Sequence, residues 1–179
     1  MVWIVKNFLS YALVVMSIVF LFQRCAIYSF SGVSLSSEVK SFSIQDFYSE
    51  VALGPPDLEQ SFTDRLRDEL LQKTSLTQVD IDGDIQFEGK ITEFSYTSLA
   101  PSASSSEQIE AANVERLKIT VEVDYTNPYE KKFAFKKKRF SQHADMPATA
   151  SADAEEERLI KEIFDKLMQD IFNNSVANW

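Results

Sequence analysis

The chain of 179 residues contains very little cysteine, histidine and glycine, with one, one and four residues respectively. A single cysteine cannot form a disulfide within the chain, so no disulfide framework supports the fold. The one histidine, His143, has no second histidine or free cysteine to complete a metal site or a nucleophilic pair. The serine-rich residues 102–106 lack a glycine-rich elbow, which argues against a hydrolase. These absences predict a protein without catalytic residues, metal or cofactor.

Basic residues are also in the minority. The chain has 18 Lys and Arg against 27 Asp and Glu, which gives a formal net charge of −9. An acidic protein is a poor candidate for general nucleic-acid binding, which needs a net basic surface or a large basic patch. Fourteen Phe against four Gly predict a packed domain rather than a disordered chain.

Residues 1–24 are predicted to be a lipoprotein signal peptide. Residues 8–22 form an uncharged apolar run with only Lys6 ahead of it, and this run is shorter than the roughly 20 residues that a membrane-spanning helix needs. The only cysteine, Cys25, closes this segment. In bacterial lipoproteins such a cysteine is acylated and becomes the first residue, and its acyl chains hold the protein on a membrane.

Two alternatives for the N-terminus stay open. Gln23 and Arg24 precede Cys25, where lipoprotein signals usually have small residues. The segment can therefore also be an uncleaved anchor with Cys25 as a nearby thiol, or an ordinary signal peptide that is cut elsewhere. Removal of residues 1–24 leaves 155 residues with 16 basic and 27 acidic side chains, a formal charge of −11. That length is typical of one domain, which we place at 38–179 after a short aromatic tether at 25–37.

Alternation of apolar and polar residues predicts strands at 39–48, 85–96, 117–125 and 132–140. In the second of these, the apolar residues change from odd to even positions at Phe94, which predicts a bulge near Thr92 and Glu93. A turn beginning at Asn127 and Pro128 predicts that the last two strands form a hairpin. Residues 98–112 and 141–152 are predicted to be loops by their small, polar composition.

Two further segments, 57–73 and 153–172, are predicted to be amphipathic helices. Asp57 with Gln60, and Asp153 with Glu156, match N-terminal capping patterns. The expected buried stripe of the first helix is Leu58, Phe62, Leu66 and Leu70, widened by Leu71. That of the second is Leu159, Ile160, Ile163, Phe164, Leu167, Met168, Ile171 and Phe172.

This order of elements predicts an α+β domain in which two amphipathic helices pack on one face of a four-stranded mixed β-sheet. The first strand reaches the second through a helix, which favours a right-handed parallel crossover, and the later strands follow as an antiparallel meander. Residues 80–84 (DIDGD) are similar in composition to a calcium loop. The twelfth position counted from Asp80 is Ile91 rather than glutamate, so a turn into the second strand is expected instead.

Several short sequences, in their order and spacing, point to a known family. They are CAIYSFSG at 25–32, QKTSL at 72–76, FEGKIT at 87–92, RLKITV at 116–121, DIFNN at 170–174 and the final Asn178 and Trp179. Together they resemble the Bacteroidetes form of the lipopolysaccharide-assembly lipoprotein family, LptE. The resemblance implies a non-enzymatic domain that is tethered to the outer membrane by Cys25. It also implies that the domain sits as a plug inside the β-barrel protein LptD and helps lipopolysaccharide to reach the cell surface. An alternative is a periplasm-facing lipoprotein that acts as a binding or scaffold module in envelope maintenance, without a barrel partner.

One cluster of basic residues contrasts with the acidic chain: Lys131 and Lys132, then residues 136–139 (KKKR). It can protect an edge strand from pairing with other sheets. It can also bind the phosphate and carboxylate groups of lipopolysaccharide, and the two interpretations are compatible. The candidate ligand-binding residues are Lys132, Lys136, Lys138 and Arg139, with Arg116 and Lys118 on the neighbouring strand. Alternation along the strand predicts that Lys136 and Lys138 share one face and that Lys137 and Arg139 share the other.

Overall fold

The computed structural model describes residues 35–99, 114–147 and 150–177. The predicted signal peptide, Cys25 and most of the tether therefore lie outside the described residues, as does most of the loop expected at 98–112. The described strands are β1 (Ser41–Ile44), β2 (Tyr48–Ser49), β3 (Thr77–Gln78), β4 (Ile85–Leu99), β5 (Val114–Thr126) and β6 (Phe135–Pro147). The described helices are α2 (Leu58–Lys73) and α3 (Ala152–Ser175).

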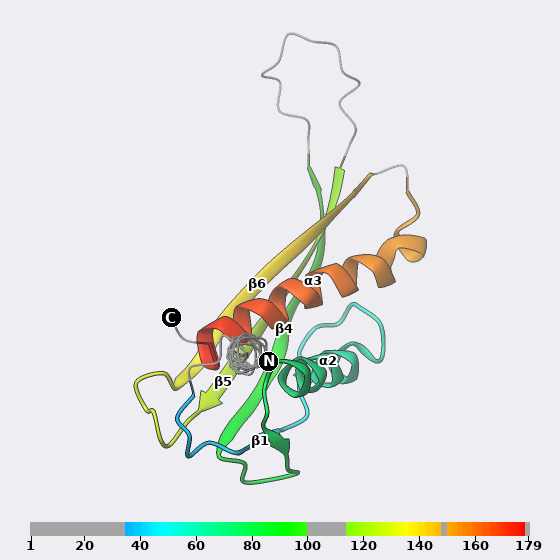
Figure 1. The fold of residues 1–179 in the computed structure, drawn as a ribbon. Coiled ribbons are helices and arrows are strands. Elements are labelled where there is room, and N and C mark those ends of the chain that lie inside the picture. The colour runs from blue at the N-terminus through cyan, green and yellow to red at the C-terminus, as the bar shows by residue number, and fades with distance from the viewer. Residues whose placement is uncertain (1–34, 100–113, 148–149, 178–179) are drawn as a thin grey trace, which may run out of the picture. The chain divides into compact units, whose positions relative to one another are not determined.

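The strands form one mixed sheet in the order β3-β1-β4-β5-β6, with β2 pairing along β4 beyond β1 (Figure 1). β1 lies parallel to β3 and β4, and β4, β5 and β6 are antiparallel neighbours. The α+β class, the parallel crossover and the meander are thus confirmed. The predicted number of four strands is wrong, because the described sheet has six.

The two additional strands have different origins. The segment expected as one strand at 39–48 is interrupted because Phe47 takes a buried position, where its amide N–H donates to Thr63 Oγ1 at 3.1 Å. This shifts the alternation by one residue, so Tyr48 is 54% exposed instead of facing the core. The pair Thr77–Gln78 is too short to produce a periodic pattern.

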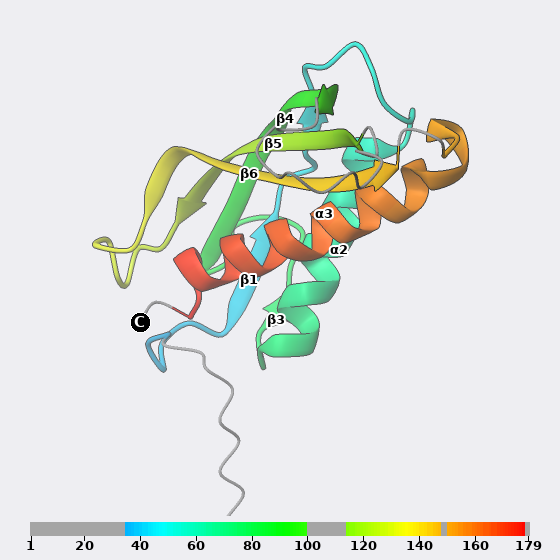
Figure 2. The same ribbon diagram turned by 90° about the horizontal axis from the view of Figure 1, so that it is seen from above.

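Both helices lie on the same side of the sheet (Figure 2). The predicted stripe of α2 is buried, except that Leu71 is 44% exposed because it is turned about 100° away from Leu70. The predicted stripe of α3 is buried throughout. The rings of Phe62 and Phe164 meet edge to face with centroids 5.2 Å apart, which joins the two helices in one core.

The predicted capping box of α2 is not formed, and α3 has a different N-cap residue from the predicted one. Asp57 occupies the N-cap position of α2, but its side chain accepts from Ser61 Oγ at 3.4 Å instead of from the first-turn amides. Gln60 does not complete a capping box because its side chain donates to Asp64. The N-cap residue of α3 is Ser151 rather than Asp153, since the backbone carbonyl of Ser151 accepts from the amides of Ala154 and Glu155.

Two bulges set the registers of the long strands. The predicted bulge in β4 is confirmed, since Ile91 pairs with Val121 and Glu93 with Thr120, which leaves Thr92 as the additional residue. A second irregularity lies between β5 and β6, where Val123 pairs with Lys138 but Tyr125 pairs with Phe135. Lys136 and Lys137 therefore oppose Asp124 alone, and Lys137 has a φ of 51°.

β6 is longer than predicted. The loop expected at 141–152 is wrong for residues 141–147, which continue the strand with Ala144 and Met146 buried. Small and polar residues alternate with these two, so composition alone favoured a loop. His143 is exposed as expected, but it lies in a strand rather than in a loop.

Candidate functional site

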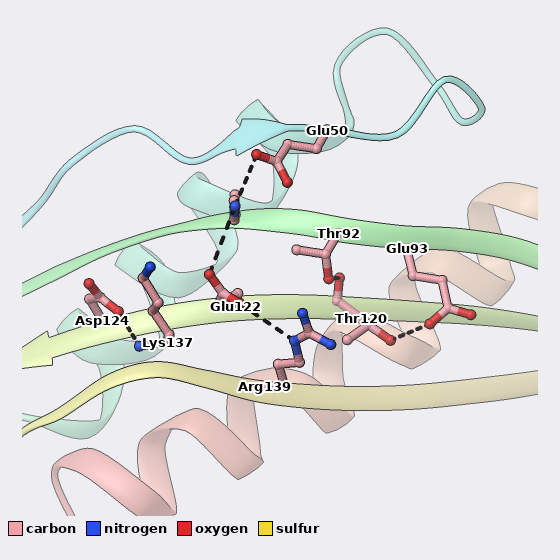
Figure 3. A network of polar contacts seen from close by, with 9 residues as sticks. Glu50, Thr92, Glu93, Thr120, Glu122, Asp124, Lys137 and Arg139 are labelled. Carbon is pink, nitrogen blue, oxygen red and sulfur yellow. Dashed lines mark hydrogen bonds and ion pairs between the residues drawn. The ribbon is translucent and has the colours of Figure 1, made fainter.

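The face of the sheet that the helices leave uncovered, here called the open face, is crossed by a chain of ion pairs. Lys90 on β4 lies between two carboxylates, with its Nζ 2.9 Å from Glu50 and 3.9 Å from Glu122. Arg139 on β6 approaches Glu122 from the other side at 3.5 Å, as Figure 3 shows. The hydrogen bond to Glu50 is the main reason that the pKa of Lys90 is raised. Arg139 is therefore already paired with an acid.

A second group on the open face is centred on Glu93. Its carboxylate accepts from Lys118 Nζ at 2.9 Å, from Thr120 Oγ1 at 2.9 Å and from Ser95 Oγ at 3.1 Å. The bond from Lys118 contributes most to the lowered pKa of Glu93, and the hydroxyl donors add to it. Lys118, one of the predicted ligand-binding residues, thus has a carboxylate partner.

Arg116 has a carboxylate partner as well. Its Nε and one terminal nitrogen donate to the two oxygens of Asp145 at 2.7 and 2.8 Å, which is bidentate geometry. This hydrogen bonding lowers the pKa of Asp145 and raises that of Arg116. The pair joins β5 to β6 where Arg116 and Asp145 lie opposite each other.

Lys138 lies on the helix side of the sheet. Its Nζ donates to Asn174 Oδ1 near the end of α3 at 2.7 Å. The same ammonium group lies 5.1 Å from the ring centroid of Phe135 and 5.6 Å from that of Phe140. Lys138 and Arg139 therefore contact groups on opposite faces, and the predicted basic cluster is not one continuous strip.

Three other lysines of the basic cluster lie at or near the turn from β5 into β6. We call Lys131, Lys132 and Lys136 the hairpin lysines; all three are exposed, and none forms an ion pair within the described part of the chain. The Nζ of Lys132 lies 4.3 Å above the centroid of the Phe133 ring. Phe133 lies in the turn and is half-buried, whereas Phe135 packs against the core.

Lys131 and Lys136 line a hollow of about 340 Å³ at this end of the hairpin. Its other lining residues are Tyr125, Thr126, Asn127, Pro128, Ala134 and Phe135. Burial raises the pKa of Tyr125 to about 12, so its phenol carries no charge that would repel an anion. Two cations beside an aromatic surface can hold the charged group of an amphiphile.

The sequence analysis named Lys132 and Lys136 but did not include Lys131 among the candidate ligand-binding residues. A signal was present, since Lys131 is adjacent to Lys132 and belongs to the same basic cluster. Which cations lack acidic partners depends on the pairing of β4, β5 and β6. Ligand binding by the six residues named from sequence stays a prediction.

The model of the family described as LptE, lipopolysaccharide-assembly, matches residues 39–175. The chain belongs to the LptE family. This family is non-catalytic and acts in lipopolysaccharide assembly, as the short sequences predicted. Among curated protein sequences, none matches the chain.

Solved structures with a similar fold share little sequence with this LptE-family chain. The hypothetical protein CT253 from Chlamydia trachomatis has a TM-score of 0.50 at 11% identity, covering 76% of this chain and 97% of that one. A minor lipoprotein from Acinetobacter baumannii has a TM-score of 0.45 at 12% identity, with 75% and 90% covered. The rare lipoprotein B from Shewanella oneidensis has a TM-score of 0.43 at 14% identity, with the same coverage. The first of these supports the fold alone.

Two further features concern only residues 35–99, 114–147 and 150–177. No helix in these ranges is both long and apolar enough to span a membrane. Their side chains also contain no group of three or more His, Cys, Asp or Glu placed to hold a metal ion. The turn at 80–84, similar in composition to a calcium loop, therefore contains no such group.

Proposed function

We propose that this protein is a lipid-anchored outer-membrane lipoprotein that plugs an LptD-type β-barrel, assists its assembly and binds lipopolysaccharide on its way to the cell surface. The match to the LptE family over residues 39–175 is the observation that carries this proposal. The hairpin lysines supply a chemical reason, because lipopolysaccharide presents phosphate and carboxylate groups to which ammonium groups form strong, charge-assisted hydrogen bonds.

The proposed anchor is the acylated Cys25. Intact-mass analysis of protein extracted from membranes tests it directly. We expect a chain that begins at Cys25 and carries acyl groups. Retention of residues 1–24, or an unmodified thiol, would show that one of the alternative N-termini is correct.

The six candidate ligand-binding residues differ in the partner that each must release before it can bind an anion. Arg116, Lys118 and Arg139 must leave a carboxylate to bind an anion, and Lys138 must leave Asn174. Lys132 and Lys136 have no acidic partner to leave among the described residues. We therefore assign the main contacts to Lys132 and Lys136, together with Lys131.

The double variant Lys132→Glu with Lys136→Glu tests this assignment. Hydrogen bonds to charged groups contribute about 1.5–3 kcal/mol each, so we expect lipopolysaccharide affinity to fall at least about tenfold. The matched control, Arg158→Glu with Lys161→Glu, makes the same charge change on α3 and should bind as the parent does. Unchanged affinity in the hairpin variant would mean that its lysines only protect the edge of the sheet.

Partnership with a barrel has its own test. Extraction of the native membrane in mild detergent, followed by purification through this protein, should yield a stoichiometric complex with a large β-barrel protein. Recovery without a barrel, but with retained lipopolysaccharide binding, would instead support the scaffold or binding module in envelope maintenance.

A further inference from the structure

The start of the folded domain and the tip of the β5–β6 hairpin are joined through one carboxylate. Asp84 Oδ2 accepts from the backbone amides of Lys40 and Ser41 at 2.9 and 3.0 Å, and from Ser41 Oγ at 2.9 Å. Its other oxygen accepts from the Tyr129 hydroxyl at 3.2 Å. In Figure 1 the first described residues lie beside the turn between β5 and β6. The hairpin tip and the point where the chain enters the domain therefore lie at the same end.

The carboxylate of Asp84 keeps its charge over a wide pH range. The hydrogen bond from the Lys40 amide, followed by that from the Ser41 hydroxyl, lowers the pKa of Asp84 below its ordinary value. The carboxylate is thus ionised, and able to accept all four bonds, at any pH near neutrality. At neutral pH the hydrogen bond from the Tyr129 hydroxyl to this carboxylate therefore holds the hairpin tip beside the point where the chain enters the domain.

The distance from this entrance to the proposed anchor is limited by the chain. Nine residues, 26–34, lie between Cys25 and the first described residue, Leu35. The ten Cα-to-Cα steps from Cys25 to Leu35 span at most about 35 Å when fully extended. A protein anchored at Cys25 therefore keeps this end of the domain within that distance of the membrane surface.

The tip has the chemistry of a membrane-surface contact. Tyr129 is 46% exposed beside Lys131 and Lys132, and tyrosine is enriched at the headgroup level of membranes. Glu130 is the only acid in residues 127–139, although Glu38 and Asp84 lie at the base of the tip. The chain as a whole is acidic, so an anionic surface attracts this end and repels other parts of the domain.

We infer that the tip formed by Tyr129, Lys131 and Lys132 rests on the anionic phospholipid headgroups of the leaflet that carries the anchor, and so orients the domain. This inference rests on the proposed acylation of Cys25. The contact orients the domain and is not needed for attachment, because several acyl chains on Cys25 already hold a protein stably on a membrane. It requires no lipopolysaccharide.

The test uses the full protein with its anchor, reconstituted into nanodiscs. Cys25 is blocked by acylation, so Ala134→Cys, at an exposed position in the hairpin, supplies one free thiol for a spin label. Lipids with a nickel-chelating headgroup then report how close the label lies to the membrane surface. Discs of phosphatidylcholine alone are compared with discs that also contain phosphatidylglycerol, and neither contains lipopolysaccharide.

We expect relaxation of the label at residue 134 to increase several-fold more in the anionic discs than in the neutral ones. Lys131→Glu with Lys132→Glu should abolish that difference, whereas Arg158→Glu with Lys161→Glu on α3 should keep it. Equal relaxation in both kinds of disc, or an unchanged difference in the hairpin variant, overturns the inference. Intact mass of the reconstituted sample shows whether Cys25 is acylated, so absence of headgroup contact on an anchored protein counts against this inference alone.

Discussion

The two faces of the sheet use the same strands for different purposes, and β5 shows this most clearly. On the helix side, Leu117, Ile119, Val121, Val123 and Tyr125 are all at most 1% exposed. On the open face, the alternate residues pair their charges and hydroxyls across strands, as Glu93 does with Lys118 and Thr120. Burial on one side supplies stability and also sets the register, because a slip of one residue would expose every apolar side chain. The matched charges on the other side favour the same register.

Truncation in the covered face should have the largest effect. Leu66→Ala and Ile163→Ala each remove a side chain that is at most 1% exposed between the helices and the sheet. We expect each to reduce the free energy of unfolding by about 2–5 kcal/mol, measured by urea denaturation. Leu71→Ala on the exposed side of α2 is the control and should change it by less than about 0.5 kcal/mol. Losses below that value at Leu66 or Ile163 would contradict the assigned core.

A smaller loss of stability is expected from substitution of Gly89, a position on the covered face that has no side chain. Gly89 on β4 leaves room for the ring of Phe47, and a Cβ at this position would lie 2.6 Å from that ring and would also meet the Glu122 carbonyl oxygen. Gly89→Ala should therefore cost about 1–3 kcal/mol by overpacking. Ala substitution of the neighbouring Lys90, which points to the open face, should cost less. A thermal midpoint of Gly89→Ala equal to that of the parent would mean that both the Phe47 ring and the Glu122 carbonyl shift without cost.

The contribution of the open face to stability should become measurable on acidification. The pKa of Glu93 is lowered in the folded protein, so folding favours its ionised form. That contribution is complete above the ordinary value of 4.5 and is lost as the pH falls through the lower folded value. Because exposed ion pairs contribute roughly 0.2–1 kcal/mol, Glu93→Gln should cost about that much at pH 7. The variant should also lose less stability than the parent on acidification, and parallel pH profiles of the two proteins would contradict the assignment.

The hairpin lysines should contribute least to stability. Lys131→Ala, Lys132→Ala and Lys136→Ala remove no ion pair of the described chain, so each should change the free energy of unfolding by less than about 0.5 kcal/mol. Arg116→Ala, which leaves Asp145 without its bidentate partner, is the matched comparison and should cost more. If the two sites prove equal in urea denaturation, pairing on the open face has no measurable energetic value.

Features with local causes were predictable from the sequence. The alternation in residues 117–125, the stripe of α3 and the phase change at Thr92 each lie within one segment, and the structure confirms them. The division between β1 and β2 was not predictable, because it depends on Phe47 packing against α2 and β4. The same holds for the end of β6, since Ser141, His143 and Asp145 are polar by composition but alternate with buried residues.

The candidate site divides in the same way. Charge alone drew attention to Lys132 and Lys136, and those residues lie without acidic partners in the described chain. Pairing of Arg116 with Asp145 could not be foreseen, because it depends on the register of β5 with β6, and the bulge at Lys136 and Lys137 shifts that register. A prediction that extended strict alternation through residues 136–139 could not show which lysine faces which surface.

The parallel pairing of β1 with β4 has a consequence for the order of folding. Phe42 pairs with Ile85, and the whole of α2 lies between them in the chain, whereas β4, β5, β6 and α3 each pack on a sequence neighbour. Closing the longer loop costs more chain entropy before any contact forms, so the C-terminal elements should assemble first and β1 should join late. In stopped-flow experiments Phe42→Leu should then mainly speed unfolding, while Val121→Ala should mainly slow refolding.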